Sequence, residues 1–275
     1  MRMGGNMIEK AYAKINLTLE IVGKKEGYHL LESVVIPIDL HDTLTFSLSH
    51  QDEVISNVSI KDNNILKAIH LFKQTYQIDQ CVKVILDKQI PIGAGLGGSS
   101  ADISATLRGL NRLFKLNKPL KELEGLANQL GSDTLFCLYN KRSFIYGRGD
   151  YIHFYENNDK LDILLILPNI SLLTKDVFHS YGLLKEKHNY IGFESYLKKG
   201  DMAFIVDHSK NDLLKAALAL SQPFHTLYHQ LIASNLKVHM SGSGPALFMI
   251  NPTKEEINSV KSLNENTLLL FSKAL

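Results

Sequence analysis

The stretch with the clearest chemical potential is rich in glycine and runs Pro91-Ile92-Gly93-Ala94-Gly95-Leu96-Gly97-Gly98-Ser99-Ser100. Glycine lets the backbone approach a ligand closely and adopt positive φ. The two serines stand where helical spacing begins, so amide groups, the helix dipole and hydroxyls meet at one point. This combination predicts a phosphate-binding loop, and a plain glycine turn with a serine N-cap is the alternative.

Better-known phosphate motifs do not fit this stretch. A P-loop requires lysine before the serine or threonine, and Gly98 stands there instead. The glycine spacing of a dinucleotide site is present, but Lys88-Gln89-Ile90-Pro91 separates it from the preceding strand. The chain also lacks the HRD and DFG sequences of protein kinases. The phosphate loop therefore belongs to another class.

A second candidate region lies near the N-terminus, where polar and apolar residues alternate between 11 and 21. This period of two predicts a strand over 11–21 with one apolar and one polar face. Lys14, Asn16 and Thr18 share the polar face, which we expect to turn away from the core. Taken alone, Lys14 is more typical of a solvated lysine than of a catalytic one.

Three motifs in order resemble those of the GHMP kinases, a family that includes galactokinase, homoserine kinase and mevalonate kinase. They are Ala11-Tyr12-Ala13-Lys14-Ile15-Asn16-Leu17, the glycine-rich stretch, and Met240-Ser241-Gly242-Ser243-Gly244-Pro245-Ala246. Together they span nearly the whole chain. The resemblance implies phosphoryl transfer from ATP, with Mg²⁺, to a small-molecule hydroxyl. It also implies a two-domain α+β fold with the active site in the cleft between the domains.

The resemblance assigns a role to several residues. Lys14 matches the family's catalytic lysine, and Asp133 matches the aspartate that takes the hydroxyl proton. Taken alone, Asp133 is equally a helix cap, and Leu135 replaces a proline that the family commonly has. No metal ligand is identifiable. Asp102 is acidic, but an acidic residue in the first turn of a helix is already explained by its favourable interaction with the helix dipole. ATP would be bound by Pro91, Gly93, Ala94, Gly95, Leu96, Gly97, Gly98, Ser99 and Ser100, with Asn64 and Lys88 near the adenosine.

Shorter motifs, GYHLLES, GSD and GRGD, resemble the branch of the family whose substrate carries a cytidine diphosphate. There, Tyr28 and Phe178 would enclose the cytosine ring while His29 reads its edge. Taken alone, Phe178 is equally a core residue. The rest of the substrate would contact Asn16, Gly242 and Ser243. A mevalonate- or homoserine-type kinase and a non-catalytic nucleotide-binding regulator of the same fold stay open as alternatives.

The composition is that of an ordinary globular protein. The 275 residues carry a formal net charge of only +2, which gives no reason to expect nucleic acid or a membrane as partner. Cys81 and Cys137 stand apart and predict buried thiols in the cytoplasm rather than zinc ligands. Helices and strands without a regular rhythm predict α+β domains at 1–155 and 156–275, joined through the polar stretch 155–160. We expect a monomer or weak homodimer.

Hydrophobic periodicity predicts the remaining elements. Helices are expected over 64–76, 99–114, 120–130, 174–184, 193–198, 212–221, 223–234 and 253–263. Further strands are expected over 33–47 (interrupted near Pro37 and His41), 82–86, 143–146, 161–167, 238–240, 246–250 and 267–271.

Overall fold

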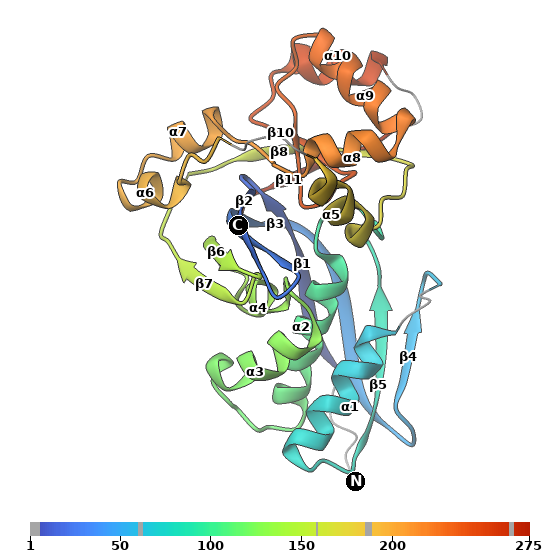
Figure 1. The fold of residues 1–275 in the computed structure, drawn as a ribbon. Helices are drawn as coiled ribbons and strands as arrows, with labels where there is room; N and C mark the ends of the chain where they lie inside the picture. The colour runs from blue at the N-terminus through green and yellow to red at the C-terminus, as the bar shows by residue number, and fades with distance from the viewer. Residues whose placement is uncertain (1–5, 60–62, 158, 185–188, 264–266) are drawn as a thin grey trace. The chain divides into compact units, whose positions relative to one another are not determined.

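The computed structural model describes residues 6–59, 63–157, 159–184, 189–263 and 267–275. Helices and strands are mixed along the chain (Figure 1), which confirms the α+β class. The chain forms two compact units. The first contains Met1–Ala13, Leu40–Ile92 and Gly97–Lys141, and the second contains Lys14–Asp39, Gly93–Leu96 and Arg142–Leu275. The predicted domain limits and the oligomeric state stay predictions.

The strands of the first unit form part of a seven-stranded sheet. β4 (Glu53–Ser56) pairs in parallel with β5 (Cys81–Asp87), and β5 pairs antiparallel with the second half of β3 (Tyr28–Ser49). β1 (Met7–Asn16) also pairs with β3. Alternate side chains of these strands are buried, as period two requires for a sheet covered on one face: Leu44, Phe46, Val82, Val84 and Leu86.

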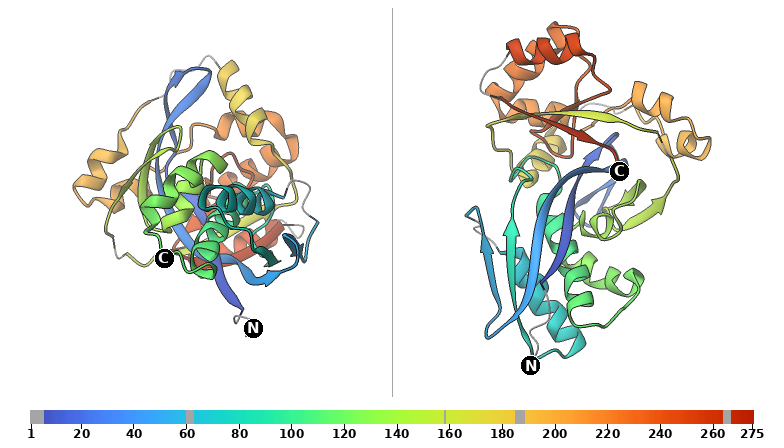
Figure 2. Two further views of the ribbon diagram at one scale, coloured as in Figure 1. Left: turned by 90° about the horizontal axis from the view of Figure 1, so that it is seen from below. Right: turned by 180° about the vertical axis from the view of Figure 1, so that it is seen from behind.

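Helices cover one face of this sheet (Figures 1 and 2). They are α1 (Asn64–Tyr76), α2 (Gly98–Leu113), α3 (Leu120–Leu130) and α4 (Thr134–Tyr139). Gly109 of α2 packs so closely on β3 that a Cβ there would lie 2.5 Å from the Phe46 ring. This contact fixes the position of α2, whose first turn follows the glycine-rich stretch.

The second unit contains two groups of strands. The first half of β3 pairs antiparallel with β2 (Glu20–Lys25) and with β6 (Ser143–Gly147), and β6 pairs with β7 (Tyr151–Phe154). A separate antiparallel sheet has the order β11-β8-β10-β9. Its strands are β8 (Asp162–Pro168), β9 (His239–Met240), β10 (Leu247–Ile250) and β11 (Thr267–Lys273).

Helices pack on the four-stranded sheet around one hydrophobic core. They are α5 (Thr174–Leu183), α8 (Leu214–Leu220), α9 (Gln222–Ala233) and α10 (Lys254–Leu263). Leu164 and Ile166 of β8 meet Val177, Phe224 and their neighbours in this core. Two shorter helices, α6 (Phe193–Lys198) and α7 (Met202–Asp207), follow α5 along the chain. The start of α5 and the strand that leads into the turn after β9 both contribute side chains to this core.

Some sequence predictions were wrong. β3 runs without interruption through Pro37 and His41 over 22 residues, because a proline without an amide hydrogen is tolerated where the ladder does not need a donor. The strand predicted over 11–21 breaks between Asn16 and Glu20. Four short elements were missed: β4, β7, α4 and α7. Each is four to six residues long, too short for a periodic signal.

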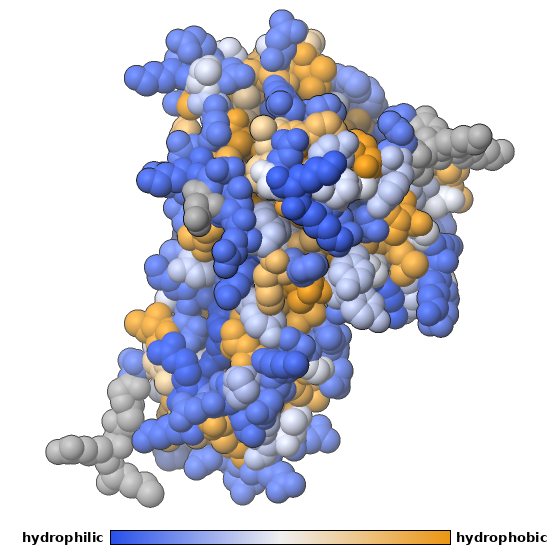
Figure 3. All heavy atoms as spheres, turned by 90° about the vertical axis from the view of Figure 1, so that its left-hand side faces the viewer, coloured by the Kyte–Doolittle hydropathy of each residue, from blue (hydrophilic) through white to orange (hydrophobic). Residues whose placement is uncertain are grey.

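The cysteines and the surface complete the description. Cys137 is buried as predicted, whereas Cys81 is partly exposed, and both are free thiols. Within the part of the chain that the structure describes, no helix combines the length and apolar character needed to cross a membrane. On the face shown in Figure 3, apolar side chains stand in small groups between hydrophilic ones. Most large apolar side chains are instead buried.

Candidate active site

The two glycine motifs meet inside the second unit. A Cβ at residue 95 would lie 2.5 Å from the carbonyl oxygen of Ser241 and 3.0 Å from that of Gly244. Gly95 also has φ of +80°, which favours glycine. The Ser241 hydroxyl donates to the Gly95 carbonyl at 3.0 Å, and the Ala246 amide donates to the Ala94 carbonyl at 3.0 Å. Segments 93–96 and 241–246 therefore pack directly against each other through backbone atoms.

Gly95→Ala is expected to lower the free energy of unfolding by about 2–3 kcal/mol, because the new methyl group meets backbone atoms in a strained conformation. Gly93→Ala is the matched control. Gly93 has φ of +72° but nothing within 4 Å of the new Cβ, so only the cost of positive φ, about 1 kcal/mol, is expected there. Urea denaturation of both variants measures the difference. Equal losses would contradict the close packing of the two motifs.

Lys14 and Asn16 extend from the end of β1 onto this structure. The Lys14 ammonium donates to Asn16 Oδ1 at 2.6 Å and to the Gly95 carbonyl at 3.2 Å. The Asn16 side-chain amide donates to the Ser33 hydroxyl at 2.8 Å. Both side chains are buried, with 4% of their surface exposed. The predicted turning of this polar face away from the core was wrong, because the polar groups are buried with hydrogen-bond partners of their own.

The C-terminal glycine motif borders the same two side chains. A Cβ at Gly242 would lie 3.2 Å from the Lys14 ammonium and 3.6 Å from Asn16 Oδ1. Asn211 holds this turn, since its amide donates to the carbonyls of Met240 at 2.9 Å and Gly242 at 2.8 Å. Nothing in the sequence singles out Asn211. The structure thus brings together the predicted residues Lys14, Asn16, Gly95 and Gly242. Ser243 follows in the same turn, and its hydroxyl lies 2.9 Å from that of Thr174.

The end of the predicted phosphate loop lies in the first unit. α2 begins at Gly98, and its N-cap is Gly97, which has φ of +72° and no side-chain cap. Ser99 and Ser100 therefore stand in the first turn, and the alternative in which one of them caps the helix was wrong. The first amides of a helix have no partner within it and favour an anion. Asn64 joins this group, because its amide donates to the Ser99 hydroxyl at 3.0 Å.

Asp133 is placed beside the same helix. It occupies the N-cap position of α4, yet its side chain makes no capping hydrogen bond, so the helix-cap interpretation fails. A Cβ at Gly131 would lie 3.6 Å from the Ser100 hydroxyl. The Ser104 hydroxyl of α2 donates to the Thr134 carbonyl at 2.7 Å. α2 therefore carries both the serines of the loop and the contacts that hold the Asp133 turn.

Lys88 lies at the base of the loop. Its ammonium is paired with Asp42 and, at 2.8 Å, with Asp102. Burial raises the pKa of Asp102 to about 7, against the opposing effect of Lys88. Among the residues that the structure describes, no group of three or more His, Cys, Asp or Glu side chains could hold a metal ion.

The predicted cytosine-binding residues lie in the second unit. The His29 ring is 5.6 Å from the Phe178 ring and 5.3 Å from the Tyr181 ring. The Arg148 guanidinium lies 3.7 Å from the centroid of the exposed Tyr28 ring. Burial, and secondarily Lys24, lower the pKa of His29, so its ring is neutral at pH 7. His29 Nδ1 is buried with no hydrogen-bond partner in the described part of the chain.

Sequence reasoning missed two members of this group, although a signal for each was present. Tyr181 follows Phe178 by three residues on α5, so both share one helix face. Arg148 belongs to the GRGD motif, and the Asp150 carboxylate accepts the Arg148 amide at 2.7 Å. This turn directs the guanidinium over Tyr28.

The sequence is similar to those of known proteins. Residues 63–141 match the N-terminal domain of the GHMP kinases. A Staphylococcus aureus protein named "Putative 4-diphosphocytidyl-2-C-methyl-D-erythritol kinase" is 34% identical over 250 residues, covering 87% of this chain and 88% of the relative. The chain belongs to this family of GHMP kinases. It is therefore an enzyme of the small-molecule kinase class.

Solved GHMP kinases have the same fold. A crystal structure of 4-(cytidine 5'-diphospho)-2C-methyl-D-erythritol kinase matches with a TM-score of 0.79 at 24% identity, over 98% of this chain and 99% of that one. Homoserine kinase from Cytophaga hutchinsonii matches with a TM-score of 0.69 at 19% identity, over 98% and 94%. The predicted α+β fold of a GHMP kinase is thereby confirmed.

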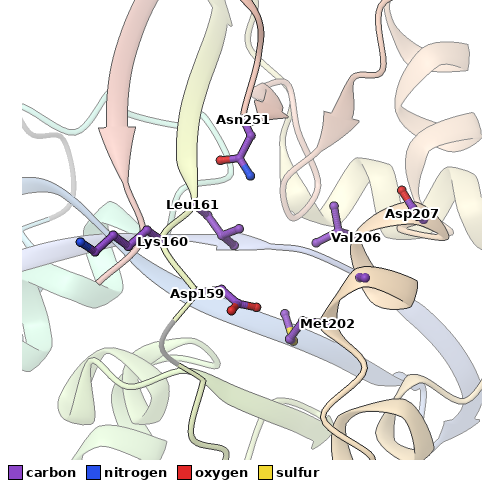
Figure 4. A pocket seen from close by; sticks show the side chains of 8 residues that line it. Asp159, Lys160, Leu161, Met202, Val206, Asp207 and Asn251 are labelled. Atoms are coloured by element: carbon purple, nitrogen blue, oxygen red, sulfur yellow. The ribbon is translucent and has the colours of Figure 1, made fainter.

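The GHMP kinase also has a pocket outside the predicted site. It lies in the second unit, has a volume of about 440 Å³, and is drawn in Figure 4. Its lining residues include no predicted site residue: they are Asp159, Lys160, Leu161, Met202, Ala203, Val206, Asp207 and Asn251. The candidate active site is thus assigned from the glycine motifs and their polar neighbours.

Proposed function

We propose that this GHMP kinase transfers the γ-phosphoryl group of ATP to the 2-hydroxyl of 4-diphosphocytidyl-2-C-methyl-D-erythritol, a step of non-mevalonate isoprenoid synthesis. The observation that carries the choice of substrate is the aromatic group around His29, because it supplies rings and a neutral imidazole for a pyrimidine. The name of the Staphylococcus aureus relative supports the same choice. A cytoplasmic location belongs to this proposal.

ATP would be bound through its phosphates by the glycine-rich loop. The open amides at the start of α2 and the hydroxyls of Ser99 and Ser100 fit an anion. Mg²⁺ would neutralise part of the triphosphate charge. The hydroxyl oxygens of Ser99 and Ser100 lie in the phosphate loop and could act as ligands for it. Asn64, which is bonded to Ser99, would lie towards the adenosine.

The chemical step would use one carboxylate and one ammonium. The Asp133 carboxylate would take the proton of the substrate 2-hydroxyl as its oxygen bonds to the γ-phosphorus. The bond from that phosphorus to the β,γ-bridging oxygen breaks, and ADP leaves. Lys14 would stabilise negative charge on the transferred group. Its burial and its bonds to Asn16 and Gly95 fix the ammonium in place.

The cytosine ring would be held by the aromatic group of the second unit. Tyr28 would stack on the base with Arg148 on its other face, and Phe178 would close the opposite side. Stacking on a base contributes on the order of 1–3 kcal/mol. The Nδ1 atom of the neutral His29 ring has no hydrogen-bond partner among the described residues and would bond the edge of the base.

An ADP-release assay with three acceptors tests this proposal. The value of kcat/KM for the cytidyl compound is expected to exceed that for mevalonate or homoserine by at least about 10⁴-fold, because only the former fills the polar base site. Comparable rates with mevalonate or homoserine would favour another GHMP kinase. ATP binding without ADP release from any acceptor would favour a non-catalytic regulator.

A further inference from the structure

Three charged side chains are buried together at the base of the glycine-rich loop, all in the first unit. They are Asp42 on β3, Lys88 after β5, and Asp102 one turn into α2. Their side chains are 0%, 7% and 7% exposed. The Lys88 ammonium donates to Asp102 Oδ2 at 2.8 Å and also to Asp42 Oδ2. The ammonium therefore bridges two carboxylates at a site from which solvent is largely excluded.

This cluster joins the two ends of the loop. Asp42 Oδ1 accepts the amides of Gln89 at 2.6 Å and Ile90 at 2.7 Å, which directly precede the loop. Asp102 belongs to the helix that follows the loop. At the helix start, a Cβ on Gly98 would lie 3.0 Å from both the Lys88 ammonium and Ile90 Cγ2. The first turn of α2 thus rests directly on the segment that enters the loop.

The charges of the cluster are not balanced. Two carboxylates face one ammonium, and Asp102 Oδ1 is buried with no hydrogen-bond partner among the described residues. Burial raises the pKa of Asp102, and Asp42 adds to the rise through its charge and a hydrogen bond. A buried ion group of this kind is a poor source of stability compared with apolar packing. Its position instead suggests a role in holding the loop.

We propose that Asp42, Lys88 and Asp102 form a clamp that positions the glycine-rich loop for the triphosphate, so that Lys88 acts on ATP through the loop rather than by contact. This inference rests on the proposed kinase function. A loop whose ends are already fixed loses less conformational freedom when ATP binds. Two of the three donors of the Lys88 ammonium point to these carboxylates, so at most one is left for a ligand.

The test compares the full-length protein with Lys88→Met, Asp102→Asn and the double variant. Two quantities are measured: the dissociation constant of ATP, and hydrogen exchange of residues 91–100 without ligand. Lys88→Met is expected to weaken ATP binding about tenfold and to speed exchange about tenfold, because the loop ends separate. Asp102→Asn alone is expected to stay within about threefold of the parent, since an amide can still donate to Asp42.

The double variant decides between the two roles of Lys88. With a clamp, the asparagine introduced by Asp102→Asn can bond Asp42 directly, so ATP affinity and exchange return to within about threefold of the parent. If Lys88 touches ATP itself, the double variant binds as weakly as Lys88→Met, and the clamp is refuted. Lys83→Met is the control, because Lys83 pairs with Glu53 on the neighbouring strand, outside the loop. It is expected to change neither quantity.

Two further results keep the inference testable. If Lys88→Met does not fold, Asp102→Ala replaces it and is expected to weaken ATP binding about fivefold, whereas Asp102→Asn is not. Equal affinity of these two variants would overturn the clamp. A parent protein that releases ADP with none of the three acceptors would refute the proposed function. The exchange pattern of the loop would still decide whether the clamp exists.

Discussion

Asp133→Asn is expected to lower kcat about a thousandfold while the dissociation constant of ATP stays unchanged. Asparagine keeps the size of the side chain but cannot take a proton from the substrate hydroxyl. The turn that holds residue 133 is fixed by other contacts, including the bond from Ser104 to the Thr134 carbonyl. The free energy of unfolding is therefore expected to change by less than about 1 kcal/mol.

This result is measured by ADP release at saturating substrates, with ATP binding followed separately by titration. Glu122→Gln is the matched control, because Glu122 is an exposed carboxylate of the same unit that pairs with Lys118. It is expected to leave kcat unchanged. A loss below about tenfold in Asp133→Asn would show that another group takes the proton or that none is needed.

The local pattern of the sequence predicted much of the fold. Long helices have an apolar stripe, and α1 and α3 begin and end where that pattern predicts. The short helix α4 could not be found this way, since its six residues are nearly all buried and show no stripe. That helix presents Asp133, so the residue was located through the GSD motif while its supporting element was missed.

The environment of Lys14 shows why the site could be predicted only in part. Alternation along the first strand correctly separated its apolar side chains from its polar ones. It could not show that the polar side is also buried, because Gly95 and Ser33, which bond the Lys14 and Asn16 side chains, come from distant parts of the chain. The same holds for Asn211, which supports the second glycine motif across 31 residues. Long-range polar contacts leave no local signal.

Lys14→Met is expected to lower kcat between about a hundredfold and about a thousandfold, because it removes the fixed donor that we propose stabilises the transferred phosphoryl group. Methionine keeps most of the length and fits a buried site. The Asn16 and Gly95 oxygens lose a donor, so unfolding should become easier by only about 1–3 kcal/mol. A buried ammonium that adds little stability but controls turnover is the mark of a catalytic residue.

Lys10→Met provides the matched control for this variant. Lys10 lies on the same strand, β1, but its side chain is exposed, so neither kcat nor stability is expected to change. Steady-state kinetics and urea denaturation are measured on both variants. Lys14→Met could lose activity only because less of the protein is folded. If kcat calculated per folded molecule then equals that of the parent, Lys14 only supports the fold. A loss of kcat in fully folded protein separates the two roles, because packing then remains while the charge is gone.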